Sequence, residues 1–234
     1  MAAETQVLVD NEKKYIAKFF SDASESDVKK VDISTLSWAK HTITLSGAAS
    51  PNFKIGEVLT VGAEKYLVTG FTAGASTVEV VGWDNTNKKA TAIDASSSNG
   101  DAVSGGVSGN NTRTYSSIAE QDFNVLVTKI MWITNGLQVA IEWDGSGSEA
   151  YIAELSGNGS WSMPGNEWPG IGINASGDSG NVLGDIQFST TDHASGDSYT
   201  VIMELKKQSG YDIPAYEQNN ILGYPVDYLL GNFT

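Results

Sequence analysis

The sequence predicts an all-β protein, an antiparallel β-sandwich of jelly-roll type with a small inserted β-barrel and a C-terminal extended arm. Three observations lead to this fold class. Apolar residues gather in short runs, several of which alternate apolar and polar side chains as a half-buried strand does. Glycine is abundant, at 25 of 234 residues, and proline is scarce, at five. Short strands that are separated by glycine-rich turns are typical of sandwiches and barrels.

The first strands of the sandwich are expected within residues 1–40. Residues 6–9 (QVLV) and 14–20 (KYIAKFF) are rich in β-branched and aromatic side chains, and an Asp-Asn pair between them is typical of a turn. Residues 28–36 follow a polar loop, and their apolar side chains alternate with polar neighbours. This period of two predicts a third strand with one buried face.

Residues 41–112 have a different character and predict the inserted barrel. Their apolar runs are very short, and glycines punctuate them throughout. A chain that turns this often suits a small, strongly bent barrel placed between strands of the larger domain. Residues 94–109 (DASSSNGDAVSGGVSG) are rich in serine and glycine, so we expect them to form a flexible exit from the barrel.

Residues 113–208 are expected to complete the sandwich with its longest strands, at 124–134, 137–143 and 199–206. The first two are joined by Asn135 and Gly136, a pair that favours a tight β-hairpin. We expect Trp132 and Trp143 to fill the core between the sheets. Alternate side chains of the second strand share one face: Leu137, Val139, Ile141 and Trp143.

The C-terminal residues 209–234 show no clean period but hold many aromatic side chains, which a disordered tail would lack. Two interpretations stay open. The segment packs back on its own domain, or it is an arm that reaches a neighbouring subunit. Its tyrosines are candidate partner contacts: Tyr211, Tyr216, Tyr224 and Tyr228.

Charge and composition exclude several classes of function. The formal net charge is −14, and Arg113 is the only arginine. Nucleic-acid binding needs clustered cations to replace the released counterions, so we expect no direct nucleic-acid contact. No apolar run approaches the roughly 18 residues of a membrane span, and no secretory signal opens the chain. We therefore expect no membrane contact and synthesis in a cytoplasm.

The sequence offers little for catalysis or metal binding. His41 and His193 are the only histidines, and no nucleophile-elbow motif is present. The carboxylates Glu142, Asp144, Glu149 and Glu154 suit the wet face of a sheet. The 144–149 loop alternates oxygen ligands but lacks the pattern of an EF-hand, and there are no cysteines. We therefore predict no enzyme, and no catalytic, cofactor or metal residues.

Two tryptophans stand in a loop of turn residues, WSMPGNEWPG, that begins at Trp161 and includes Trp168. Exposed tryptophan stacks on sugar rings or anchors a protein interface. The alternative is that both side chains pack as a lid on their own domain. Trp161 and Trp168 therefore join the tyrosines of the tail as candidate partner contacts.

Four segments of the chain resemble, in their order, small virion structural proteins of tailed phages, especially phages of marine bacteria and cyanobacteria. The resemblance covers about residues 1–37 and 120–207, and it rests on VLVDNEKKYIAKFF, VKKVDISTLS, VTKIMWITNGLQVAIEWDG and GDIQFSTTDHASGDSYTVIMELKK. The insert is similar to a short barrel repeat of phage baseplate and capsid proteins, through NFKIGEVLTVGAEKYLVTGFTAGASTVEVV. The chain departs from the shorter family members by this insert and by its tyrosine-rich tail, which leaves head, neck and tail open as its location.

The resemblance implies a non-enzymatic accessory subunit of a phage capsid or neck, such as a decoration protein. It would be made in the host cytoplasm and end in the virion. Its partners would be copies of itself, as a homo-oligomer, and other virion structural proteins. The alternative is a carbohydrate-binding or adhesion module on the virion surface, with Trp161 and Trp168 as stacking platforms and calcium near Asp144.

Overall fold

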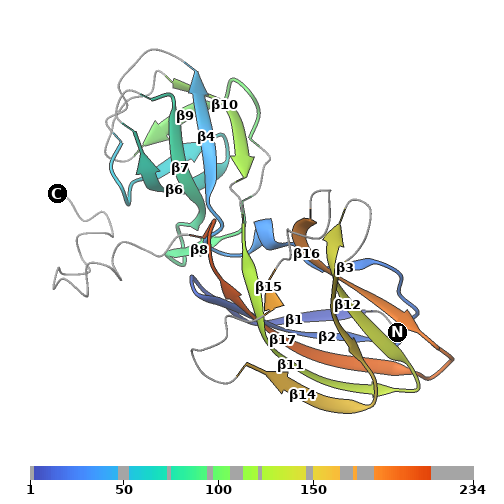
Figure 1. Cartoon of the computed structure of the whole chain (residues 1–234). Helices are drawn as coiled ribbons and strands as arrows, with labels where there is room; N and C mark the ends of the chain where they lie inside the picture. Colours follow the sequence, from blue (N-terminus) through green and yellow to red (C-terminus); the bar gives the residue numbers. More distant parts are fainter. Residues whose placement is uncertain are drawn as a thin grey trace. The chain divides into compact units, whose positions relative to one another are not determined.

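The structure, a computed structural model, describes residues 3–46, 53–72, 75–93, 97–105, 113–120, 123–145, 150–163, 171–172 and 182–211. Throughout these ranges the chain is all-β, with 17 strands and one short 3₁₀ turn, η1 (Ile33–Thr35) (Figure 1). The prediction of an all-β protein is confirmed. The chain divides into two compact units, residues 1–33 with 123–209 and residues 34–122 with 210–234.

The first unit holds two antiparallel sheets. The six-stranded sheet runs in the order β1 (Glu4–Asp10), β2 (Lys14–Ser21), β17 (Ser198–Lys207), β11 (Val125–Asn135) and β14 (Asn158–Ser162), and β15 (Ile171–Gly172) also pairs with β11. The four-stranded sheet runs in the order β13 (Ala150–Leu155), β12 (Gln138–Gly145), β16 (Val182–Thr191) and β3 (Val28–Val31).

Side chains from the two sheets meet in one core, as in a β-sandwich. Phe19 of the six-stranded sheet packs edge-on against Phe188 of the four-stranded sheet, with ring centroids 5.2 Å apart. The ring of Tyr199, also on the six-stranded sheet, lies 5.9 Å from that of Phe188. Every second residue of β2 and of β17 is buried, which is the period of a strand with one face on the core. The predicted buried face of the 137–143 segment is confirmed: Leu137, Val139, Ile141 and Trp143 are all buried.

The turn at Asn135 and Gly136 does not form the predicted hairpin. It joins β11 to β12, but β11 pairs with β14, β15 and β17, whereas β12 pairs with β13 and β16. The turn therefore carries the chain from one sheet to the other. Gly136 has a φ of 80°, and a Cβ there would lie 1.9 Å from Oδ1 of Asp197. The residue pair specifies this tight backbone, but burial of an apolar face on each strand decides that the strands lie in opposite layers.

The second unit is built on a seven-stranded antiparallel sheet. Its order is β4 (His41–Ser46), β10 (Arg113–Glu120), β9 (Ala102–Gly105), β5 (Val58–Val61), β6 (Glu64–Phe71), β7 (Thr77–Asp84) and β8 (Lys89–Thr91). Because β4 also pairs with β7, six of these strands form a closed ring of hydrogen-bonded neighbours. Apolar side chains of the ring share one core, which includes Ile43, Leu59, Val61, Tyr66, Val68 and Val80.

This unit reaches beyond the 41–112 segment that the sequence delimits. The strand β10 pairs with β4 and β9 and so belongs to this sheet. The strand β9 lies inside the 94–109 segment, which the sequence predicts to be a flexible exit, and this part of that prediction is wrong. Serine and glycine add little to packing, but Val103 of β9 is buried in the core of this unit and the backbone of β9 pairs with β5 and β10.

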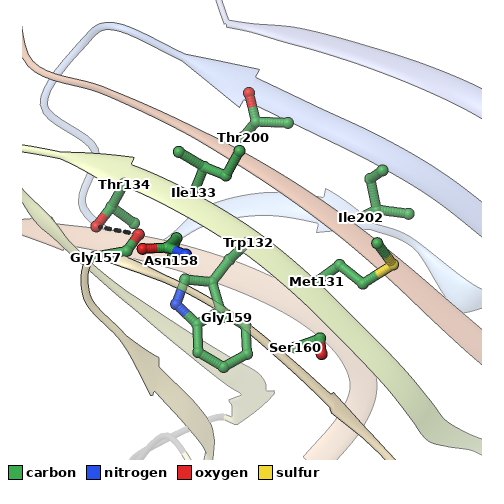
Figure 2. Close-up of a pocket in the computed structure, with 10 residues that line it drawn as sticks. All are labelled: Met131, Trp132, Ile133, Thr134, Gly157, Asn158, Gly159, Ser160, Thr200 and Ile202. Carbon is green, nitrogen blue, oxygen red and sulfur yellow. Dashed lines mark hydrogen bonds between the residues drawn. The ribbon is translucent and has the colours of Figure 1, made fainter.

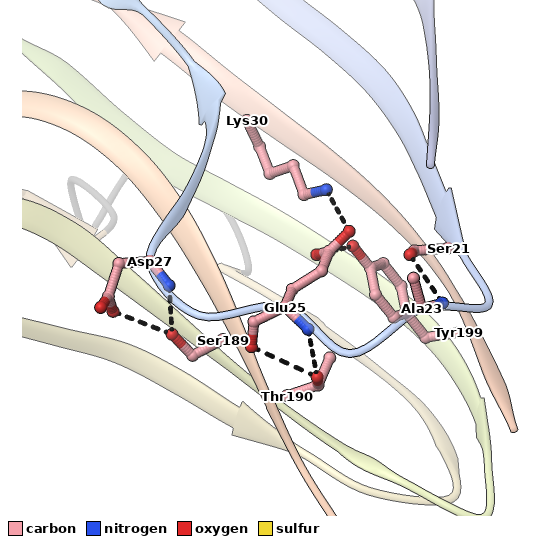
Figure 3. A network of polar contacts seen from close by, with 8 residues as sticks. All are labelled: Ser21, Ala23, Glu25, Asp27, Lys30, Ser189, Thr190 and Tyr199. Atoms are coloured by element: carbon pink, nitrogen blue, oxygen red, sulfur yellow. Dashed lines mark hydrogen bonds and ion pairs between the residues drawn. The ribbon is translucent and has the colours of Figure 1, made fainter. Parts of the chain in front are cut away.

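A buried polar network holds the connection between β2 and β3 to the first unit (Figure 3). The Glu25 carboxylate accepts hydrogen bonds from Nζ of Lys30 and from the hydroxyl of Tyr199, each 2.7 Å long. The Glu25 backbone exchanges hydrogen bonds with Thr190 on β16, at 2.8 and 2.9 Å. Nζ of Lys30 also lies 5.9 Å from the ring centroid of Phe188. Burial, followed by the Glu25 carboxylate, raises the pKa of Tyr199 well above its usual value, so this phenol stays a donor.

Candidate functional site

The face of the six-stranded sheet that points away from the core carries apolar side chains on three neighbouring strands. We call this set the apolar stripe, and it consists of Ile16 and Phe20 on β2, Ile202 on β17, and Met131 and Ile133 on β11. Ile202 lies opposite Met131 across the β11–β17 ladder. Ile133 is 64% exposed and Met131 is 39% exposed. Large apolar side chains that gather on one exposed sheet face are typical of an interaction site.

The composition of β11 explains why the stripe forms. The strand is a near-continuous apolar run, VLVTKIMWITN, which is typical of strands buried on both faces. Ile130 and Thr134 point into the core and are buried. Because side chains alternate along a strand, Met131 and Ile133 must then point to the opposite face. Both of these outward positions hold apolar residues, so this part of the strand has an apolar outer face.

A shallow groove of about 680 Å³ lies where β11, β14 and β17 meet (Figure 2). Met131 and Ile133 border it on one strand, and Thr200 and Ile202 border it on the next. Trp132 leaves β11 on the side opposite to Ile133, and its Nε1 donates a hydrogen bond to the Ser156 carbonyl at 3.2 Å. The remaining lining comes from Thr134, Gly157, Asn158, Gly159 and Ser160.

The prediction that Trp132 fills the core is wrong in part. Trp132 is on β11, and it pairs with Gly159 of the edge strand β14. Its side chain remains partly exposed. A Cβ on Gly159 would lie 2.5 Å from Cζ2 of Trp132, so the indole occupies the space that a glycine leaves open. Trp143, by contrast, is 1% exposed and sits in the core as predicted.

Basic side chains share this outer face with the apolar stripe. The strand positions with the same orientation as the stripe hold four lysines, which are Lys14, Lys18, Lys129 and Lys206, and two acidic residues, which are Glu4 and Glu204. The whole chain has 14 basic and 28 acidic residues. The outer face is therefore +2, while the remaining ten basic and 26 acidic residues give the rest of the chain −16. The face is a basic region on an acidic protein.

The outer face of the four-stranded sheet has the opposite charge. Five acidic residues lie on it, and Lys29 is its one basic residue in the described strands; the acidic set is Asp27, Glu142, Asp144, Glu154 and Asp185. We call this set the acidic face. Glu142 is 4% exposed, so the prediction of a wet sheet face is wrong for this residue, and Asp144 is partly exposed. Glu149 lies outside the described residues.

Asp185 anchors β3 to β16 at the centre of the acidic face. Its carboxylate accepts hydrogen bonds from Nζ of Lys29 at 2.6 Å and from the backbone N–H of Ile33 at 2.9 Å. Burial raises the pKa of Asp185, and the hydrogen bond from Lys29 opposes that shift. These contacts give the buried Asp185 carboxylate a structural role, because they link β16 to β3 and to the turn that follows it.

The two histidines lie in separate units, and each has a ring nitrogen beside a backbone carbonyl. Nδ1 of His41 lies 3.2 Å from the Ala39 oxygen, and Nε2 of His193 lies 3.2 Å from the Asp22 oxygen. Within the described ranges, no group of three His, Asp or Glu side chains is placed to hold a metal ion. In the same part of the chain, no helix has the length and apolar character needed to cross a membrane.

Of the predicted partner contacts, the described residues include two, Trp161 and Tyr211, which belong to separate units. Trp161 lies on β14 opposite Ile130, half-buried, on the side of the sheet away from the apolar stripe. Tyr211 is 6% exposed and forms an isolated β-bridge with Ala39 in the second unit, which leaves little of its side chain for a partner. The other candidates lie outside the described residues: Trp168, Tyr216, Tyr224 and Tyr228.

The apolar stripe was not identified from the sequence. The apolar run at 124–134 does indicate such a surface, because it has too few polar residues for a strand with one solvent-exposed face. The lysines gave no signal of their own, since they are far apart in the sequence and meet only through strand pairing.

Comparisons with known proteins give no family. No protein-family model matches the chain, and no curated protein matches it. One solved structure compared with it is described as the complete structure of manganese lipoxygenase of Gaeumannomyces graminis and partial structure of zonadhesin of Komagataella pastoris; it is 7% identical, and the alignment covers 90% of this chain and 84% of that chain. The TM-score is 0.16, and similarity at this level carries no argument about fold or function.

Proposed function

We propose that this chain is a non-enzymatic structural subunit of a phage virion, an accessory protein of the capsid or neck that associates with copies of itself and docks onto other virion proteins. The exposed apolar stripe supports this proposal, since a protein that works alone gains nothing from apolar surface left in water. The assignment to a phage virion comes from the sequence resemblance. Its segments contain β2, β11 and β17, the three strands that carry the stripe.

Replacing Ile133 with aspartate should weaken self-association by at least about 100-fold, because it removes an apolar contact worth roughly 1.5–3 kcal/mol and adds a charge that must lose its water. Light scattering coupled to size-exclusion chromatography, over a concentration series, measures the effect. Ile55→Asp is the matched control, since Ile55 is 54% exposed and lies in the second unit.

Wild-type protein that stays monomeric, and that also fails to bind purified virions or appear in them by mass spectrometry, would refute the proposal. Copy number in the particle then distinguishes the locations. Hundreds of copies indicate the head, and about a dozen indicate the neck or tail.

The finer architecture is part of the same proposal: a jelly-roll sandwich, an inserted small barrel that extends the predicted 41–112 segment to include β10, and an aromatic arm at 209–234. The closed ring of six paired strands supports the barrel. If the barrel is an insertion, then removing residues 34–122 and bridging the ends with a short Gly/Ser linker leaves a sandwich that unfolds cooperatively in urea. Loss of the near-UV circular dichroism of the shortened protein would show that the sandwich depends on the insert.

A carbohydrate-binding module is the second candidate. The partly exposed indole of Trp132 at the edge of the sheet favours it, since an aromatic ring at a protein surface can stack on a sugar. A glycan array, run with and without a calcium chelator, separates this function from protein docking.

A further inference from the structure

We propose that the basic outer face of the six-stranded sheet docks onto the acidic face of a second copy of this chain, in a head-to-tail contact. This inference rests on the proposed function and names the partner and both surfaces. It excludes the simpler arrangement in which two apolar stripes pack against each other across a two-fold axis.

The charges argue against the two-fold arrangement. Lys18 lies between two residues of the stripe on β2 and opposite Ile202, and Lys129 precedes Met131 on β11. Lys14 and Lys206 pair with each other at one end of the face. A contact of this face with itself would bring two surfaces of charge +2, each with four lysines and two glutamates, together around a desolvated apolar centre. Like charges held this close oppose association, and they do so more strongly as water leaves the interface.

The acidic face supplies the complementary charge on the opposite layer of the same unit. Asp27 and Glu154 are exposed there, and Asp144 lies 4.0 Å from Nζ of Lys29 with about a quarter of its side chain exposed. Because the two faces belong to opposite sheets of one sandwich, each copy offers a basic surface on one side and an acidic surface on the other. Every copy can therefore bind one neighbour through each face.

Tyr151 gives the acidic face an apolar anchor. It lies on β13 opposite Glu142 and is 70% exposed, the largest exposure among the large hydrophobic side chains described. The groove beside Met131 and Ile133 is the matching concave surface on the basic face. An exposed tyrosine that enters an apolar groove, with charged pairs around it, has the arrangement of a typical interface hot spot.

A contact between two different surfaces does not close after two copies. It continues around a ring when the rotation closes, and it forms an open filament when it does not. The inference therefore predicts assemblies larger than dimers, and their size should fall as salt screens the charges.

The test uses full-length protein and two single charge reversals, Lys129→Glu and Glu154→Lys, at exposed positions on the two faces. Each variant alone should associate about tenfold more weakly than wild type in sedimentation analysis. An equimolar mixture of the two should recover association, because each reversed face then meets a complementary one. Unchanged near-UV circular dichroism confirms that both variants fold.

A carbodiimide, which joins lysines directly to carboxylates that touch them, identifies the faces independently. In a mixture of ¹⁵N-labelled and unlabelled wild-type protein, mass spectrometry should find links between copies that join Lys18 or Lys129 to Asp27, Asp144 or Glu154. Association without such links, or variants that do not recover on mixing, overturns the head-to-tail contact and leaves the proposed function standing. Wild-type protein that is monomeric at every concentration overturns this inference, and the proposed function also fails if that protein does not bind the virion.

Discussion

Replacing Glu25 with alanine is expected to destabilise the first unit by about 3–5 kcal/mol, because the change leaves a buried lysine without its counter-charge. The side chains of Lys30 and Glu25 are only 5% and 4% exposed, and their charged atoms are 2.7 Å apart. Tyr199 would lose its acceptor at the same time. Urea denaturation followed by circular dichroism measures the loss as a lower midpoint at an unchanged slope.

Asp27→Ala is the control for this prediction. Asp27 lies two residues further along the same connection and accepts a hydrogen bond from Ser189 at 3.0 Å, but it is exposed, so its removal should cost no more than about 1 kcal/mol. Tyr199→Phe, which keeps the ring and removes one hydrogen bond, should fall between the two at about 1–2 kcal/mol. Equal losses for Glu25→Ala and Asp27→Ala would contradict a buried ion pair.

Trp143→Ala is the second large effect, at about 3–5 kcal/mol, because it opens a cavity between the sheets that the neighbouring side chains fill only in part. Trp143 is among the largest side chains that are fully buried. Its Nε1 has no hydrogen-bond partner among the described residues, so the loss comes from packing. Guanidinium denaturation gives the free energy of unfolding of both proteins.

Trp161→Ala makes the same deletion at the edge strand β14, where the side chain is half-buried. It should cost less than half as much, because less apolar area returns to water and the edge can relax. A loss at Trp161 as large as that at Trp143 would show that the edge carries as much of the packing as the core.

Local patterns in the sequence determined which segments are strands and which faces are buried. The alternation of Val139, Ile141 and Trp143 specifies a buried face wherever the strand is placed, because successive side chains of a strand point to opposite sides. The glycine-rich segments likewise specify frequent turns through their backbone freedom. Net charge was readable in the same way, since it is a sum over residues and does not depend on the fold.

The tertiary structure alone decided which strands pair and which side chains share a surface. The turn at Gly136 fixes a local bend, yet β11 joins β17, which lies far along the chain, and not its neighbour β12. Glu25 and Tyr199 are 174 positions apart and meet in one hydrogen bond. Lysines of β2, β11 and β17 likewise come to share one face with the apolar stripe only through strand pairing. Strand pairing depends on burying apolar faces against distant partners, a long-range free energy that no local pattern contains.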